Sequence, residues 1–444
     1  MKTIGKDRIG NDNMTTRKRK FTGPSRRAVL AGMGATVAAS TIAAPWVARA
    51  NGTIKVGFVT PGTGPLALFG ETDGWAVGKI RELLKDGFET SSGKYNVEIL
   101  VRDGQSDPNR TAEVAGDLIL NEGVHLIVPA STTDIVNNTA DQAELNGCPC
   151  ISTAAPWQAI IFPRGGQDKP FTWTYHFFWG LDEALRTFVG LWNTIETNRR
   201  VGMLFPQNAD GETWGNNEYG LPAPTKAAGF EVIVPGYFQP RTNDYTAQIT
   251  AFKTGNCDIV GGITYVDDFR TFVNQCAQQN YRPKAVTVAA ALLFPSGIEA
   301  LGDLGDGMSS EVWWTPAFPF KSSLTGQVSR DIADAWEAEM NRQWTQPLGY
   351  SHAIWEVALD ILKRSKNPLD RESNREAMAV TKIDTLIGPV DFTSGPHKNV
   401  STTPIFGGQW VKGTKWKYDL KIVDNTVNKL FEPEQPMKLM PWST

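Results

Sequence analysis

The sequence predicts an α/β fold with two similar lobes, each built on a parallel central sheet. Apolar, β-rich runs alternate with amphipathic helical patterns at a period of about 25 to 30 residues, which is typical of strand-helix-strand units. A second start at residues 200–206 repeats the plan of the first strand at residues 54–59, including a proline-containing exit loop. The roughly 390 residues after the N-terminal segment also exceed what one hydrophobic core usually serves.

In the first half, short β-rich apolar runs predict the strands, and periodic apolar positions predict the helices between them. The expected strands are residues 54–59, 97–102, 125–129 and 148–152. The expected helices are residues 71–84, 110–121 and 133–145.

The second half follows the same order and then adds a different ending. The expected strands are residues 200–206, 258–264 and 285–290, with a helix at residues 267–279. After them come helices at residues 329–344 and 351–365, and strand-forming residues at 410–423.

The N-terminal 50 residues carry the features of an export signal. Arg26 and Arg27 precede a small, apolar run at residues 28–44, and Ala48-Arg49-Ala50 is a small-x-small cleavage triplet. The paired arginines favour twin-arginine export, so we expect residues 1–50 to be cleaved and the mature chain to act in the periplasm. The alternative is a membrane anchor, but about 17 residues diluted with Gly, Ser and Thr are short for a span of roughly 20.

After removal of that segment the chain is acidic. It keeps 34 basic residues against 45 acidic residues, a net charge of −11. Nucleic acid and anionic membrane surfaces need a basic footprint, so neither is an expected partner. No later stretch is long and apolar enough to span a bilayer, so we expect no membrane insertion of the mature chain.

The cysteines and histidines form no metal-binding pattern, because the four histidines are scattered and none neighbours a cysteine. Cys148 and Cys150 are two apart on a predicted strand, so they would share one face rather than bond readily. Cys257 precedes a predicted strand and Cys276 falls late in the following helix, so a disulfide between them is geometrically reasonable. The other interpretation of this pair is two small, buried apolar side chains.

In open parallel sheets, ligands bind beyond the carboxyl ends of the strands, so the loops there form the candidate site. The first loop lacks the glycine motifs that bind phosphates and dinucleotides, so we expect no cofactor, and Phe69 and its leucine neighbours form an apolar wall. Ser131, Thr132 and Thr133 begin a helix. One hydroxyl is expected to cap that helix, and the spare hydroxyls and free amides could hold a carboxylate. The next loop adds small polar groups and Trp157.

These patterns together resemble the type I periplasmic binding proteins, most of all the leucine/isoleucine/valine-binding receptors of ABC transporters. The similarity runs over most of residues 53–425, and it rests on residues 54–71, 103–108, 131–133, 151–154, 243–245 and 386–392. It implies two Rossmann-like lobes joined by a three-crossover hinge, with a ligand in the cleft and a closing motion that a membrane permease reads. Lobe 1 would then comprise residues 53–175 plus 312–402, and lobe 2 residues 176–311 plus 403–444.

The resemblance also implies a set of ligand-binding residues. The hydroxyl loop that holds an amino-acid carboxylate falls on Ser131, Thr132 and Thr133. A backbone carbonyl and a hydroxyl of the next loop, which also contact the ligand, fall on Thr153, Ala154 and Ala155. An aromatic side chain from the first lobe falls on Phe69, and one from the second lobe falls on Tyr265.

Two departures from the family pattern concern the ligand. The ammonium-binding acid should follow the strand at residues 285–290, but Ala291, Leu292 and Leu293 stand there. Pro156 stands where an amide and a hydroxyl are expected, and proline offers neither. A buried ammonium without a counter-charge is costly. Either Asp267, Asp268 or another acid therefore substitutes, or the ligand has no amino group.

The 15 tryptophans favour the second option. Most are expected to pack in the core or on the lobe surfaces, and Trp157 and Trp214 are the best candidates for ligand contact. Trp214 lies in the loop after the first strand of the second lobe, where the family often carries a tyrosine-glycine pair. We expect a hydrophobic amino acid as ligand, with an aromatic or aliphatic carboxylate, an amide or urea as the alternative.

No catalytic arrangement of residues is visible in the sequence. His176 and His352 lie in no recognisable motif, and no G-x-S-x-G elbow is present, so we expect a binding protein and not an enzyme. A secreted hydrolase and a receptor that hands its ligand to a sensor are remote alternatives. The resemblance implies the membrane permease of an ABC importer as partner, and we expect the mature chain to be a monomer or a weak homodimer.

Overall fold

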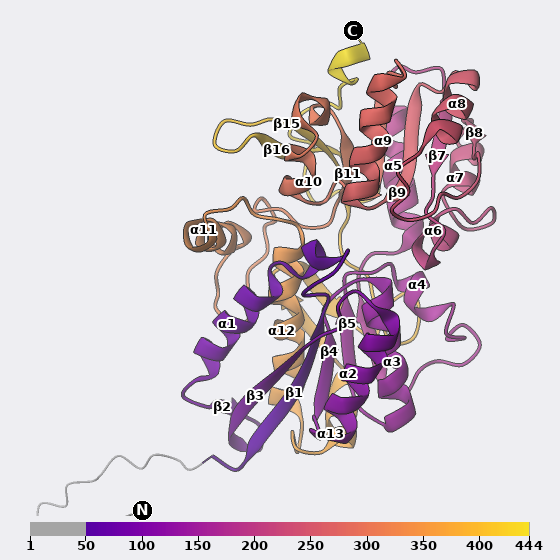
Figure 1. The fold of residues 1–444 in the computed structure, drawn as a ribbon. Helices are drawn as coiled ribbons and strands as arrows, with labels where there is room; N and C mark the ends of the chain where they lie inside the picture. Colours follow the sequence, from indigo (N-terminus) through magenta and orange to yellow (C-terminus); the bar gives the residue numbers. More distant parts are fainter. Residues whose placement is uncertain (1–49, 444) are drawn as a thin grey trace, which may run out of the picture. The chain divides into compact units, whose positions relative to one another are not determined.

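The computed structural model of the protein describes residues 50–443 (Figure 1). The twin-arginine signal expected at residues 1–50 lies, apart from its last residue, outside the described residues. The described residues belong to one compact unit. None of their helices is both long enough and apolar enough to cross a membrane.

Two seven-stranded sheets form the centres of two α/β lobes, as the repeated strand pattern predicts. The first sheet runs in the spatial order β14 (Val400–Ser401), β6 (Thr174–Phe177), β5 (Cys150–Thr153), β4 (Leu126–Pro129), β1 (Thr53–Thr60), β3 (Gly93–Asp103) and β2 (Phe88–Thr90). Its neighbouring strands are parallel except for β2 and β3. Strands β4, β5 and β6 are fully buried, as expected for a parallel sheet covered on both faces.

The second sheet runs in the order β16 (Tyr418–Asp424), β15 (Phe406–Lys412), β11 (Ser309–Val312), β10 (Ala285–Ala290), β9 (Ile259–Thr264), β7 (Arg200–Leu204) and β8 (Glu231–Ile233). The strands from β8 to β11 are parallel, and β15 and β16 add an antiparallel edge. The strand-forming residues expected at 410–423 therefore belong to a hairpin, because the short connection after β15 permits only antiparallel pairing.

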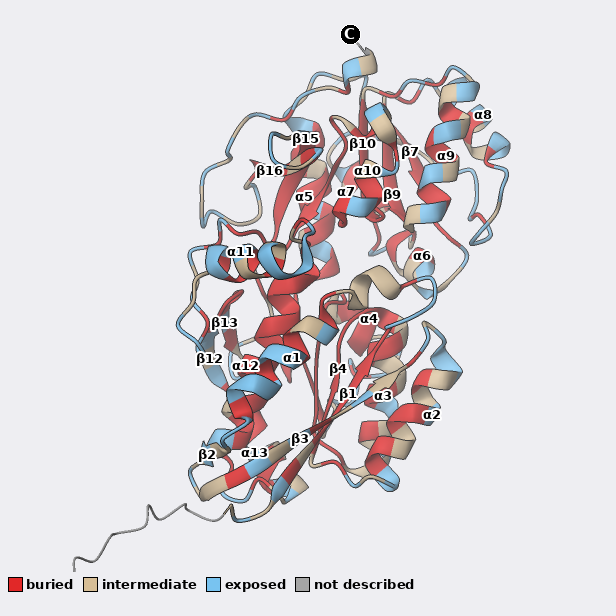
Figure 2. Ribbon diagram, turned by 60° about the vertical axis from the view of Figure 1, so that its left-hand side comes forward, coloured by how far each residue is buried: buried red, intermediate tan, exposed pale blue. Residues whose placement is uncertain are grey.

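Helices flank both sheets and turn their buried faces inward (Figure 2). They are α1 (Asp73–Leu84), α2 (Pro108–Leu120), α3 (Thr133–Asn146), α4 (Trp157–Ile161), α5 (Leu181–Asn193), α6 (Ala209–Trp214), α7 (Pro222–Ala227), α8 (Thr246–Thr254), α9 (Val266–Gln278), α10 (Pro295–Glu299), α11 (Ser329–Met340), α12 (Pro347–Arg364) and α13 (Arg371–Ala379). A small hairpin of β12 (Lys382–Thr385) and β13 (Gly388–Asp391) completes the first lobe's surface. Helix α12 is almost entirely buried and packs against α1, β4 and β5.

The chain crosses between the two sheets three times, after β6, after β11 and after β14. Strand β6 was not expected from the sequence, and it belongs to the first sheet. That sheet therefore extends through Phe177, past the lobe boundary expected at residue 175. Helix α12 returns the chain to the first sheet, and β15 and β16 return it to the second.

The four cysteines are free thiols, and all four are buried. Of the two interpretations of Cys257 and Cys276, the structure therefore supports two small buried side chains and no disulfide. The Tyr281 hydroxyl donates to the Cys257 carbonyl at 2.9 Å, and the Tyr281 N–H donates to the Cys276 carbonyl at 2.9 Å. Tyr281 thus holds the two cysteine-bearing segments together by hydrogen bonds. Burial raises the pKa of the Cys257 thiol to about 11, so this thiol is protonated at neutral pH.

Helix α11 connects the two lobes on one side, and we call it the α11 strap (Ser329–Met340). Its Glu339 accepts a hydrogen bond from Trp75 Nε1 of α1 at 2.8 Å and pairs with Lys79 of the same helix. Its Glu337 accepts a hydrogen bond from Trp416 Nε1, in the β15–β16 turn of the second lobe, at 2.9 Å. One helix therefore contacts both lobes through two acids that are two residues apart.

Candidate functional site

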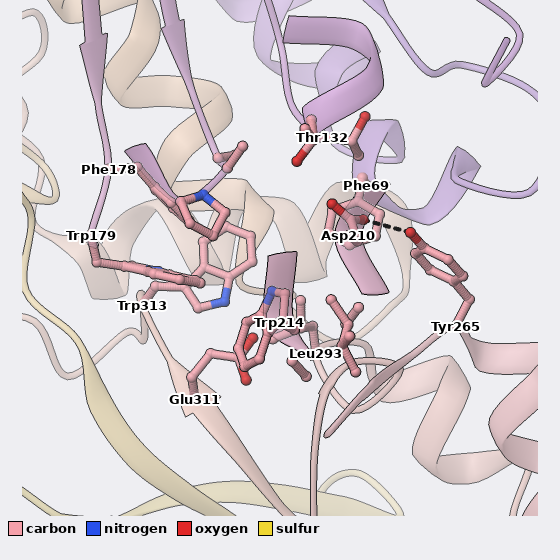
Figure 3. A pocket seen from close by; sticks show the side chains of 17 residues that line it. Phe69, Thr132, Phe178, Trp179, Asp210, Trp214, Tyr265, Leu293, Glu311 and Trp313 are labelled. Atoms are coloured by element: carbon pink, nitrogen blue, oxygen red, sulfur yellow. Dashed lines mark hydrogen bonds between the residues drawn. The ribbon is translucent and has the colours of Figure 1, made fainter. Parts of the chain in front are cut away.

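A cavity of about 50 Å³ lies between the two sheets, at the carboxyl ends of their parallel strands (Figure 3). The loops after β1, β4, β5 and β6 line it from the first lobe, and those after β7, β9, β10 and β11 line it from the second. Its 17 lining residues are Phe69, Thr132, Thr133, Ala154, Ala155, Pro156, Phe178, Trp179, Asp210, Trp214, Ile263, Tyr265, Ala289, Ala290, Leu293, Glu311 and Trp313. This is the position at which open parallel sheets bind ligands.

The structure brings together seven of the ten residues predicted to bind ligand. These are Phe69, Thr132, Thr133, Ala154, Ala155, Trp214 and Tyr265. They come from the segments after five strands, β1, β4, β5, β7 and β9, so the folding of both lobes is needed to assemble them.

The other three predicted residues lie beside the cavity without lining it. Ser131 is buried behind the α3 terminus. The hydroxyl of Thr153 donates to the Phe177 carbonyl at 2.5 Å, which joins the ends of β5 and β6. Trp157 begins α4 and stacks on His397, with ring centroids 6.1 Å apart, so its ring packs away from the cleft.

The start of helix α3 is the polar end of the cavity. The expected side-chain cap is absent there, because Thr132 has φ 68° and ψ 147° and its side chain makes no capping hydrogen bond. Its N–H instead donates to the Ala154 carbonyl at 3.2 Å, which ties the β4 and β5 loops together. The hydroxyls of Ser131 and Thr132 are buried and have no hydrogen-bond partner in the described part of the chain. Together with the free N–H groups of the first helical turn, they form an anion-binding arrangement.

Unusual backbone conformations occur at this cavity, as they do at several other positions of the described residues. Thr132, Ala154 and Ala290 all line it and all have φ between 56° and 68°, a region that residues other than glycine, asparagine and aspartate seldom adopt. Such conformations persist only where the surrounding structure enforces them, and they cluster at functional sites. The strain therefore marks the same loops that the strand-end argument selects.

Aromatic rings form most of the remaining wall. Phe178 packs edge-on against Trp313, with ring centroids 5.1 Å apart, although the two residues follow strands of different lobes. Trp214 is buried and packs against Phe188 of α5 at 5.6 Å. The indole N–H groups of Trp179 and Trp313 are buried and have no acceptor among residues 50–443. The wall is therefore apolar, but it presents two unpaired donors.

Two acids that were not predicted as site residues line the cavity. Asp210 of α6 accepts a hydrogen bond from the Tyr265 hydroxyl at 2.5 Å (Figure 3). Glu311 of β11 is fully buried, and its Oε2 accepts a hydrogen bond from the Ser310 hydroxyl at 2.7 Å. Asp267 and Asp268, the acids weighed from the sequence, line a neighbouring cavity instead.

That neighbouring cavity has a volume of about 480 Å³ and shares Tyr265 with the first. It is lined from both lobes by the Gly64–Leu68 loop, Asp134 of α3 and the first turn of α9. Burial and the nearby charge of Asp210 raise the pKa of Asp134 to about 6. Asp210 thus lies close enough to the α3 terminus for the two carboxylates to repel each other.

Physical reasons explain why the sequence did not predict the other residues that line the cavity. Phe178 and Trp179 follow β6, a four-residue strand that the sequence pattern did not reveal. Glu311 lies in β11, the strand beside β10, and Trp313 directly follows it, whereas the family pattern places the acid in the chain directly after β10. Asp210 stands four residues before Trp214, in a segment whose predicted contact with the ligand rests on the aromatic ring of Trp214.

We expect Glu311→Gln to stabilise the protein by about 2 to 3 kcal/mol at pH 8 and to have little effect at pH 4.5. Burial raises the pKa of this carboxyl from 4.5 to about 7. The stability that its protonated form provides is therefore present below pH 4.5 and is lost as the pH rises through about 7. Urea unfolding at the two pH values measures the difference. The exposed Glu212→Gln is the control, and a Glu311→Gln effect that is independent of pH would contradict the argument.

Comparison with known proteins gives consistent matches along the chain. Residues 53–415 match a family model described as periplasmic binding protein. Leu/Ile/Val-binding protein homolog 7 of Brucella abortus (strain 2308) is 22% identical over an alignment of 378 residues, and the match covers 82% of this chain and 91% of that protein.

Two solved structures show the same fold with different bound molecules. The branched-chain amino acid transporter substrate-binding protein LivJ from Streptococcus pneumoniae, in complex with isoleucine, is 16% identical with a TM-score of 0.66, covering 84% of this chain and 99% of that one. A solute-binding protein of an ABC transporter from Rhodopseudomonas palustris BisB5, in complex with 3,4-dihydroxybenzoic acid, is 18% identical with a TM-score of 0.67, covering 88% and 99%.

Proposed function

Because this chain belongs to the periplasmic binding protein family, we propose that it is the solute receptor of an ABC importer and closes over a small carboxylated molecule. The receptor would be exported through the twin-arginine route, would act in the periplasm as a monomer or a weak homodimer, and would deliver its solute to a membrane permease. Its role is binding and release, without chemical conversion of the solute.

The observation that carries this proposal is the uncapped start of helix α3. The unpartnered hydroxyls of Ser131 and Thr132, the hydroxyl of Thr133 and the free backbone N–H groups all belong to one helix terminus. A helix of 14 residues carries a partial positive charge at that end. A solute carboxylate there would satisfy groups that are otherwise buried without partners.

An α-amino acid is the first candidate solute. Asp210 lines the same cavity as Thr132 and Thr133 of the α3 terminus, and it carries a carboxylate that could pair with an α-ammonium group. Asp210 would then be the ammonium-binding acid, in place of Asp267 and Asp268. The aromatic and aliphatic wall would then hold an apolar amino-acid side chain.

An aromatic or aliphatic carboxylate without an amino group is the second candidate. The six aromatic side chains of the wall favour it, because stacked and edge-on ring contacts add to apolar burial. The Rhodopseudomonas palustris relative bound to 3,4-dihydroxybenzoic acid supports this class as well. An amide or urea would leave the α3 terminus without an anion.

Thermal unfolding against a panel of solutes tests the function and separates these classes. The panel contains L-leucine, L-phenylalanine, benzoate, 4-hydroxybenzoate, butyrate, acetamide and urea. A solute at 100 times its Kd adds about 2.7 kcal/mol of stability, which raises the midpoint by about 3 °C for a chain of this length. The proposal requires a shift with at least one carboxylate and no product after incubation. No shift with any carboxylate would overturn it.

Thr133→Ala is expected to weaken carboxylate binding about tenfold and to leave the ligand-free midpoint within about 1 °C. The variant removes one hydroxyl from the α3 terminus but keeps the helix. Thr139→Ala, in the same helix but outside the cavity, should bind normally. Isothermal titration calorimetry measures both. Equal affinities for the two variants would show that the carboxylate binds elsewhere.

A further inference from the structure

Glu311 and Trp313 form a second polar point in the cavity, separate from the α3 terminus. Glu311 lies in β11, Trp313 stands directly after the end of that strand, and both side chains line the cavity. They are 2% and 1% exposed, so water does not compete for their polar groups. In Figure 3 they lie with Trp179 on one side of the pocket, whereas Thr132 and Asp210 lie on the other.

The hydrogen-bonding capacity of this pair is only partly used. Oε2 of Glu311 accepts from the Ser310 hydroxyl at 2.7 Å, and backbone N–H groups of Ala290 and Glu311 itself also favour its ionised form. In the described part of the chain, no lysine, arginine or histidine forms an ion pair with Glu311. The indole N–H of Trp313 has no acceptor there either. An indole donor without a partner thus stands beside a buried carboxyl that accepts hydrogen bonds but forms no ion pair in the described part of the chain.

We propose that Glu311 and Trp313 bind a hydroxyl group at the end of the solute that is distant from its carboxylate. A hydroxyl can donate one hydrogen bond and accept another, so it matches a carboxyl acceptor beside an N–H donor. An ammonium group donates but cannot accept, and a methyl group does neither. The proposal rests on the proposed function, because the α3 terminus must hold the carboxylate for the far end to reach Glu311.

This assignment separates two selectivities within one pocket. Asp210 is half-buried, is hydrogen-bonded to Tyr265 and belongs to the side of the α3 terminus. Glu311 lies deep on a strand of the second sheet. Asp210 would therefore distinguish amino from non-amino carboxylates, and Glu311 with Trp313 would distinguish hydroxylated from plain ones.

The test compares matched solutes by isothermal titration calorimetry. The pairs are benzoate and 4-hydroxybenzoate, L-phenylalanine and L-tyrosine, and butyrate and 4-hydroxybutyrate, with 4-aminobutyrate as the charged donor. In at least one pair the hydroxylated member should bind about 10- to 100-fold more tightly, because the unhydroxylated member leaves buried polar groups unpaired. The compound 4-aminobutyrate should not share this gain.

Two variants and one control assign the preference to the pair. Glu311→Met keeps the side-chain length but removes the acceptor, and Trp313→Phe removes the donor, so each should reduce the preference to less than about threefold. The exposed Glu212→Gln should keep it in full. A preference that survives both variants, or equal wild-type affinities within every pair, would overturn the inference while the proposed function stands. Failure of every carboxylate to bind would overturn both.

Discussion

Asp210→Asn is expected to lower the affinity for α-amino acids about 100-fold and to leave the affinity for non-amino carboxylates unchanged or slightly higher. The Asp210 carboxylate lies near the start of α3, and its side chain is fixed by the Tyr265 hydroxyl at 2.5 Å. Asparagine keeps the size of the side chain and can still accept from Tyr265, so the substitution removes the charge and little else. An ammonium group would then be buried without its counter-charge.

Asp267→Asn is the matched control, because it makes the same change on the other side of Tyr265. Asp267 lines only the neighbouring cavity, and its side chain is 86% exposed. Titration of L-leucine, L-phenylalanine and benzoate into the wild type and both variants measures the effect. If the amino acids lose no affinity with Asp210→Asn, this acid is not the partner of an ammonium group. If only benzoate and its relatives bind the wild type, the receptor belongs to the non-amino class.

Gly262→Ala is expected to destabilise the protein by more than about 4 kcal/mol, which is an exceptional value for a single methyl group. Gly262 lies in β9 with φ 134°, and a Cβ there would stand 2.1 Å from the Leu204 carbonyl oxygen of β7. The neighbour is backbone within a parallel sheet, so it cannot move aside without breaking the β7–β9 pairing. These two strands carry the loops with Asp210 and Tyr265, so solute binding should fall as well.

Gly78→Ala provides the opposite control. A Cβ at Gly78, in helix α1, would meet no heavy atom within 4 Å. Alanine should therefore stabilise that helix by up to about 1 kcal/mol. Urea unfolding of both variants measures the contrast. A loss of less than about 1 kcal/mol for Gly262→Ala would mean that the β7–β9 pairing is looser than its geometry indicates.

The sequence was sufficient to predict the architecture and seven of the 17 residues that line the cavity. Most strands and helices were visible as periodic apolar patterns, the strand-end rule led to Thr132 and Thr133, and the family resemblance led to Tyr265. The rule works because loops at the carboxyl ends of parallel strands converge whatever their composition. The rule does not predict the order of the strands in each sheet, and that order determines which other residues line the cavity.

Glu311 shows why the acids were harder to find. The family pattern places an ammonium-binding carboxylate in the chain directly after β10. In this protein β11 lies next to β10 in the sheet, and it brings Glu311 to the cavity at the carboxyl ends of the strands. An acid on a neighbouring strand can occupy the same place in the cavity as an acid directly after β10. Residue spacing along the chain does not reveal such an acid, because the order of the strands in the sheet is needed. Glu311 and Trp313 can be assigned to the site only when the position of β11 in the sheet is known.

The α11 strap has a consequence for how opening of the two lobes depends on salt. Its ion pair with α1 joins two exposed side chains, since Lys79 is 43% exposed and Glu339 is 45% exposed. Ion pairs of this kind contribute at most about 1 kcal/mol and weaken as salt rises. An opening motion that breaks the Lys79–Glu339 pair would therefore be favoured by concentrated salt, by no more than about fivefold. The buried side chains of the strap, Trp336 among them, would carry the part of the contact that salt does not weaken.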